Sequence, residues 1–184
     1  MTLPDSERVP MLTVVSIAMA SALVPLSSTM IAVALPHIAR DFDISRGRAG
    51  LLVTVYLVAM LAGQPISGRI CDAVGARRTG LAALSGFAVC CTVAVFAPTF
   101  AVLLGALIGQ AMFASAFTPS VQSELRVITP PGQRGRVFGL FGAALGVGAA
   151  AGPVVGGILI AVAGWHGIFV VNLPVVAVAV AVFW

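Results

Sequence analysis

The chain has 184 residues, of which 60% are hydrophobic and only 9% are charged, and its mean hydropathy is +1.11. This composition excludes an ordinary water-soluble domain, in which about a quarter of the residues are charged. The ten basic residues, which give a net charge of +4, are dispersed between apolar segments, and this pattern excludes a nucleic-acid-binding surface.

Uncharged segments long enough to cross a membrane recur along the chain. A hydrocarbon core of about 30 Å requires about 20 apolar residues in a helix. The segments lack the alternating polarity of barrel strands, so we predict an all-α membrane protein. The six predicted spans cover approximately residues 11–36, 49–67, 80–98, 100–122, 137–164 and 168–184.

The two ends of the chain differ in character. Residues 1–10 form a polar tail that contains Asp5, Glu7 and Arg8. The last apolar segment, 168–184, is short and has no polar flank, so we expect the six-span half-domain of residues 11–184 to be truncated at its C-terminus.

The positions of the Arg residues predict the orientation in the membrane. If the N-terminus is cytoplasmic, the inner side carries Arg8, Arg69, Arg77, Arg78, Arg126, Arg134 and Arg136, and the outer side carries Arg40, Arg46 and Arg48. Positive charge favours the cytoplasmic side. We therefore expect a multi-pass protein of the plasma (inner) membrane with a cytoplasmic N-terminus.

Residues 68–78, GRICDAVGARR, are predicted to form a tight cytoplasmic turn between the second and third spans. Gly68 and Gly75 would permit the reversal, and Asp72 could meet the N-terminus of a neighbouring helix or an Arg. The alternative is that this loop collects Arg only because of the positive-inside bias.

A second motif lies in the fifth predicted span. Gly148, Gly152 and Gly156 follow one another at intervals of four residues, with Pro153 and Gly157 beside them. Such a stripe lets another helix approach closely, and the Pro permits a bend. The alternative is that Gly is simply common in membrane helices.

Together these segments resemble the major facilitator superfamily, and most closely its fourteen-span drug:proton antiporter branch. Residues 68–78 look like the family loop G-x-L-x-D-x-x-G-x-R/K, with Ile70 for Leu, and residues 148–157 match G-x-x-x-G-P-x-x-G-G. Residues 27–36 and 165–174 are similar to motifs of the first and sixth spans. Two charged positions of the branch are replaced, by Ser27 in the first span and Leu107 in the fourth.

The resemblance implies one half of a major facilitator fold, made of two three-helix inverted repeats, with the substrate cavity between two halves. The partner would be a missing C-terminal half or a second half-transporter. In the family the loop Asp is coupled to an Arg and to an acid of the fourth span, and the matching residues are Asp72, Arg77 and Glu124.

Uncharged polar residues on the spans that line the cavity in the family are substrate candidates. These are Ser21, Ser28, Tyr56, Gln64 and Gln110. For each Ser the alternative is a bond to its own helix backbone. A buried Gln has up to four hydrogen-bonding sites to satisfy, which makes Gln110 the stronger candidate.

The expected function is secondary active efflux of small amphipathic compounds by alternating access. Uncoupled movement of a neutral metabolite, or a non-transporting half-domain that assembles with a partner, remains open. The sequence offers no nucleophile constellation, metal-ligand cluster or phosphate loop, so we predict no enzyme, cofactor or metal. The expected partners are the lipid bilayer, a small-molecule substrate and the second half.

Overall fold

The computed structural model describes residues 17–183, so the predicted tail 1–10, residues 11–16 and Trp184 lie outside the described part. Within it the chain is helical, without strands, in keeping with the all-α prediction. The helices are α2 (Leu23–Asp41), α3 (Arg46–Val74), α4 (Ala76–Val95), α5 (Phe100–Ile128), η2 (Pro131–Gln133), α6 (Arg134–Ala163), α7 (Gly167–Val170) and α8 (Asn172–Phe183). A short helical stretch, residues 17–21, precedes α2.

Five of the described helical segments are long and apolar enough to cross a membrane, and a shorter apolar one follows them. Most extend beyond the predicted spans. The first continues through Pro36 to Asp41, and the second continues through Gly68 to Val74. Charged flanks can remain helical outside the apolar stretch, so hydropathy alone places the helix ends too early.

The predicted turn at residues 68–78 is reduced to one non-helical residue, Gly75. Its φ of 97° is a left-handed value that favours glycine. The Gly75 N–H donates to the carbonyl oxygen of Cys71, and the Thr79 hydroxyl donates to the Gly75 carbonyl oxygen, both at 2.9 Å. These bonds satisfy backbone groups where α3 ends and α4 begins.

At the opposite end of the bundle, side-chain caps start two helices. Ser45 Oγ accepts from the N–H of Arg48 at 3.2 Å at the start of α3, and Thr99 Oγ1 accepts from the N–H of Val102 at 3.3 Å at the start of α5. Each cap satisfies an N–H that has no partner within its helix.

The last predicted span, 168–184, is interrupted rather than continuous. Helix α7 ends at Val170, and α8 begins at Asn172. Pro174 has no backbone N–H, so the carbonyl of Val170, four residues earlier, loses its helical partner. A turn at Val171 absorbs the break.

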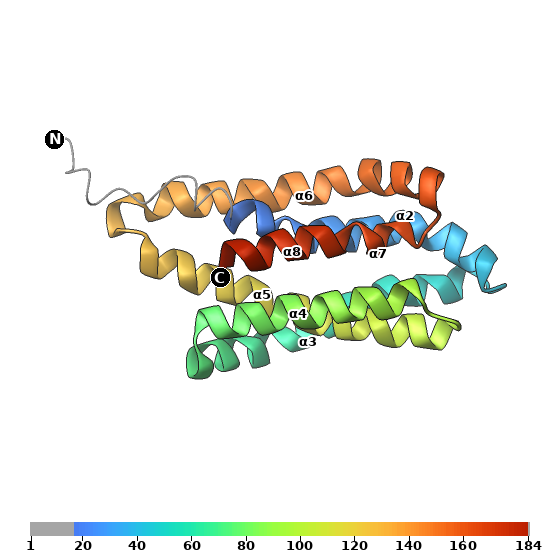
Figure 1. Cartoon of the computed structure of the whole chain (residues 1–184), viewed down its shortest axis with the longest axis horizontal. Coiled ribbons are helices and arrows are strands. Elements are labelled where there is room, and N and C mark those ends of the chain that lie inside the picture. The colour runs from blue at the N-terminus through green and yellow to red at the C-terminus, as the bar shows by residue number, and fades with distance from the viewer. Residues whose placement is uncertain (1–16, 184) are drawn as a thin grey trace.

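The long helices run roughly parallel or antiparallel to one another, as Figure 1 shows. Helix α2 packs extensively on α6, and α5 packs extensively on α3. If each of the first three spans is exchanged for the corresponding one of the second three, the pair α2 and α6 becomes the pair α5 and α3. This equivalence is expected for two three-helix repeats. In Figure 1 the turns 42–45, 96–99 and 164–166 lie at one end, called here the Trp165 end, and Gly75 and residues 129–133 lie at the other, the Gly75 end.

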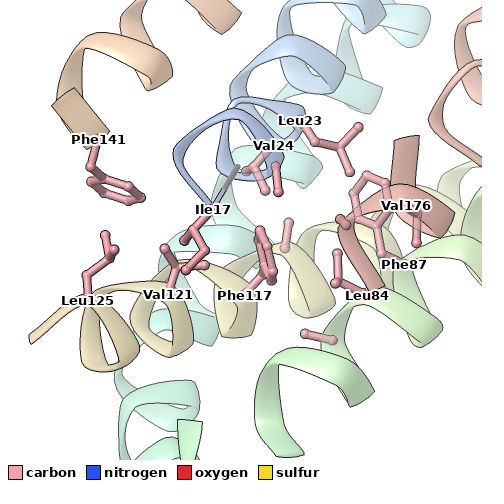
Figure 2. Packing of buried hydrophobic residues seen from close by; sticks show 14 of the residues in the cluster. Ile17, Leu23, Val24, Leu84, Phe87, Phe117, Val121, Leu125, Phe141 and Val176 are labelled. Atoms are coloured by element: carbon pink, nitrogen blue, oxygen red, sulfur yellow. The ribbon is translucent and has the colours of Figure 1, made fainter. Parts of the chain in front are cut away.

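An apolar core joins the first span with α4, α5, α6 and α8. Figure 2 shows Ile17 of the first span close to Val121 and Phe117 of α5, and Val24 belongs to the same cluster. Leu84, Phe87 and Val176 from α4 and α8 extend the same core. The half-domain thus has an apolar interior of its own.

Candidate functional site

Two spans approach each other closely along the glycine stripe of α6. A Cβ atom built on Gly148 would lie 2.5 Å from the carbonyl oxygen of Ala22, and one on Gly156 would lie 3.2 Å from Cγ of Met30. A Cβ on Gly152 would overlap the hydroxyl of Thr29. The three glycines therefore share one face, which contacts the first span, while Gly157 has open space around it.

The first span presents polar atoms to this contact. Thr29 Oγ1 donates to the carbonyl oxygen of Pro25 at 2.9 Å or of Leu26 at 3.0 Å. Pro25 lacks an N–H, so its helix has a locally weakened backbone ladder at this level. Pro153 of α6 lies within the facing helix, so both partners of the contact carry a proline inside the membrane-crossing region.

The cavity candidates fall into two groups. Ser21, Tyr56 and Gln110 are at most 2% exposed and lie inside the bundle, where they offer no surface to a ligand between two halves. Ser21 donates to its own helix at the carbonyl oxygen of Ile17, 2.8 Å away. Ser28 is half-buried and donates to the carbonyl oxygen of Pro25, and Gln64 is exposed on α3.

Gln110 belongs to a buried polar cluster, which is defined by Cys91, Gln110 and Asn172. Gln110 Nε2 donates to Cys91 Sγ at 3.0 Å, and Asn172 Nδ2 lies 3.8 Å from the same sulfur. The carbonyl oxygens of both amides have no partner. The cluster joins α4, α5 and α8 in the interior of the bundle, and the role of Gln110 in a substrate cavity stays a prediction.

A small pocket at the Gly75 end contains the loop-motif acid. It measures about 170 Å³ and is lined by Gly68, Cys71, Asp72, Pro119, Gln122, Ser123 and Arg126. The pocket places Asp72 of α3 across from Arg126 in the last turn of α5. Glu124 is half-buried on α5 and is not a lining residue, and Arg77 is exposed in the first turn of α4.

Arg126 lines the same pocket as Asp72, whereas the sequence interpretation named Arg77 as the Arg coupled to Asp72. The sequence position of Arg126 could have indicated this, because Arg126 lies at the same end of a neighbouring span as Asp72. The coupling of Asp72 with Arg77 and Glu124 stays a prediction.

The Trp165 end contains a second arrangement that the sequence interpretation missed. Trp165 Nε1 donates to Asp41 Oδ2 at 2.7 Å, which ties the turn after α6 to the end of α2. The Trp165 ring lies 5.8 Å from that of Phe42, which contacts Phe100 at the start of α5. This aromatic cluster holds three spans together at one end of the bundle.

The described part of the chain is a bundle of long apolar helices in two exchangeable sets of three, with its charged side chains near the two ends, and this arrangement is expected of one half of a transporter fold built from repeats. The sequence pattern of the Major Facilitator Superfamily matches residues 17–184, and the chain belongs to this family.

Relatives with named roles are similar along most of the chain. The "Tetracenomycin C resistance and export protein" of Streptomyces glaucescens is 31% identical over 89% of this chain and 30% of its own length. The "Puromycin resistance protein pur8" of Streptomyces alboniger is 34% identical over 90% of this chain and 33% of its own length. The chain thus spans about a third of the length of these relatives.

Solved structures support the fold alone. A bacterial homologue of the iron transporter ferroportin in an outward-facing state has a TM-score of 0.77 and 17% identity. The match covers 100% of this chain and 48% of that one, so the helices correspond to about one half of a solved transporter.

Proposed function

We propose that the protein exports small amphipathic organic compounds by alternating access, with the described helices forming one wall of the substrate path. The observation that carries this proposal is the similarity of nearly the whole chain to relatives named for drug resistance and export. The glycine contact between α2 and α6 supports it, because two helices packed without intervening side chains can move as one body.

The other wall would come from a second half. In an apolar 18-residue stretch of each span, only 22% of the residues are buried for the span that contains α3 and 17% for the one that contains α6, against 56% for the first span. Gln64 lies on the exposed part of α3, and a polar side chain in that position favours an aqueous cavity or a protein partner over lipid. We therefore propose that α3 and α6 face the second half and the substrate path.

We propose a cytoplasmic Gly75 end and hence a cytoplasmic N-terminus in the inner membrane. The Gly75 end carries Arg69, Arg77, Arg78, Arg126, Arg134 and Arg136, whereas the Trp165 end carries Arg40, Arg46 and Arg48. This asymmetry follows the positive-inside bias.

Uncoupled movement of a neutral metabolite is the second candidate. It is favoured by one observation: in the described helices no Asp, Glu or His lies in the central part of a span, where a coupling proton would have to be carried. Under the export proposal, the coupling carboxylate belongs to the second half.

Reconstitution separates the two candidates. The full-length protein is placed in proteoliposomes containing ethidium, and dye movement is measured with and without a pH gradient. We expect gradient-driven movement that disappears when the intramembrane acids of the second half are neutralised. Dye movement that ignores the gradient, or gradient-driven movement that survives those substitutions, would contradict the proposed mechanism.

A further inference from the structure

A second pocket lies at the Trp165 end, far along the bundle from the Asp72 pocket. Its volume is about 420 Å³. It is lined by His37, Arg40, Asp41, Gly164, Trp165 and His166. The end of α2 and the turn after α6 therefore border an open pocket that is large enough for a phosphate group or a small carboxylate.

The lining has more potential cations than free anions. His37 and Arg40 are exposed on α2, so their polar ends are available to a ligand. Asp41 is the acid of the pocket, and one of its carboxylate oxygens already accepts from Trp165 Nε1 at 2.7 Å. The His166 ring stacks on Trp165 with a centroid separation of 3.7 Å, which holds the imidazole at the rim.

Arg40 and Asp41 bring opposite charges to this lining, and the imidazoles of His37 and His166 add N–H donors to it. The charged neighbours on the packed elements are Asp43, Arg46 and Arg48, and Arg46 and Asp43 line an adjoining pocket that shares Arg40.

We propose that the pocket at His37, Arg40 and His166 binds an oxyanion group, a phosphate or a carboxylate. A guanidinium presents paired N–H donors that match the oxygens of such a group, and each imidazole can add an N–H donor. The oxyanion belongs either to a free solute or to the headgroup of an anionic lipid. This site is separate from the glycine contact and does not depend on which compound is exported.

The test titrates inorganic phosphate into the purified full-length protein in neutral detergent. Binding is measured by calorimetry and by the thermal-unfolding midpoint. We expect phosphate to bind and to raise this midpoint. Arg40→Gln is expected to weaken phosphate binding about ten-fold, and His37→Gln or His166→Gln is expected to weaken it by a smaller factor.

Two further variants make the test specific. Asp41→Asn keeps an oxygen that can accept from Trp165 but removes the negative charge, so it is expected to tighten phosphate binding about three- to ten-fold. Arg46→Gln removes a cation that lines the adjoining pocket and not this one, and it is expected to change affinity less than two-fold.

A lipid arm separates the two sources. The same proteins are placed in phosphatidylcholine vesicles with and without phosphatidylglycerol, and their unfolding midpoints are compared. Stabilisation by phosphatidylglycerol that Arg40→Gln abolishes, without phosphate binding, would identify a headgroup and support the proposal. If neither probe binds, or if Arg46→Gln weakens binding as much as Arg40→Gln, the proposal is overturned.

Discussion

Replacement of Gly152 by Ala tests the contact between α2 and α6 with the smallest change that the chain allows. The added methyl would overlap the Thr29 hydroxyl, and it would lie 2.8 Å from Thr29 Cβ and 3.1 Å from the carbonyl oxygen of Leu26. A rotation of the Thr29 hydroxyl would relieve the first overlap only. The Cβ atom and the backbone oxygen cannot move aside without a shift of the helix.

The expected cost follows from these distances. Ordinary contacts begin at about 3.4 Å or beyond, so the helices would have to separate locally by about half an ångström or more, and overpacking of this kind typically costs about 1–3 kcal/mol. Ala has an intrinsic helix preference of about 1 kcal/mol over Gly, which offsets part of this cost. We therefore expect the free energy of unfolding of Gly152→Ala to be about 1–3 kcal/mol lower than that of a control variant that gains the helix preference of Ala without the overlap.

Gly157→Ala is that control, because it belongs to the same motif and a Cβ there meets nothing within 4 Å. The thermal-unfolding midpoint of each full-length variant would be measured in detergent, and transport in proteoliposomes. Thr29→Ala in the Gly152→Ala background should recover part of the loss, since it removes the overlapping oxygen and leaves Cβ in place. Equal midpoints for the two glycine variants would refute the argument, because they would mean that the helices do not meet closely at Gly152.

Two other substitutions probe the polar positions. Asp72→Asn should lower transport several-fold while the free energy of unfolding changes by less than about 1 kcal/mol, because Asp72 is exposed and exposed charges contribute little to folding. Equal losses of transport and membrane abundance would contradict this. The matched control is Asp43→Asn, because Asn is tolerated at the Asp43 φ of 49°. Gln110→Met should change the transport rate by less than about two-fold and should leave stability unchanged or raised by about 1 kcal/mol, because it removes a buried carbonyl oxygen without a partner. A large transport defect at normal stability would instead support a role for Gln110 in the substrate path.

The fold was predictable because hydropathy is a property of whole segments. Runs of about 20 apolar residues indicate spans whatever their neighbours, and the family motifs indicate how the spans connect. The helix ends were less predictable. Gly75 alone breaks the chain where a loop of eleven residues was expected, since the flanking charged residues are compatible with helix. The interruption before Asn172 depends on a single Pro that membrane helices often accommodate.

The site was predictable in part. Regular spacing places Gly148, Gly152 and Gly156 on one face of a helix, but it does not say which helix they meet, and the structure gives the first span. Polarity likewise marks Gln110 as unusual without saying whether it faces a cavity or a neighbouring helix. Its contact with Cys91 joins residues from two helices, and Asn172 from a third lies near the same sulfur. The bond between Asp41 and Trp165 joins residues 124 positions apart, and no local pattern indicates it.

The distribution of titratable groups restricts where proton coupling could reside. In the described part of the chain, Asp41, Asp43 and both His lie near the Trp165 end, and Asp72 and Glu124 lie near the Gly75 end. Ser27, at the position where related antiporters carry an acid, is 2% exposed with an unpartnered hydroxyl, and a hydroxyl does not titrate near neutrality. A proton could therefore meet this half at either end, but its passage between the ends would require a carrier on the second half. The pairing of an uncharged first span with Leu107 in place of the family's Arg is consistent with this division, because an Arg in lipid without its acid would be costly.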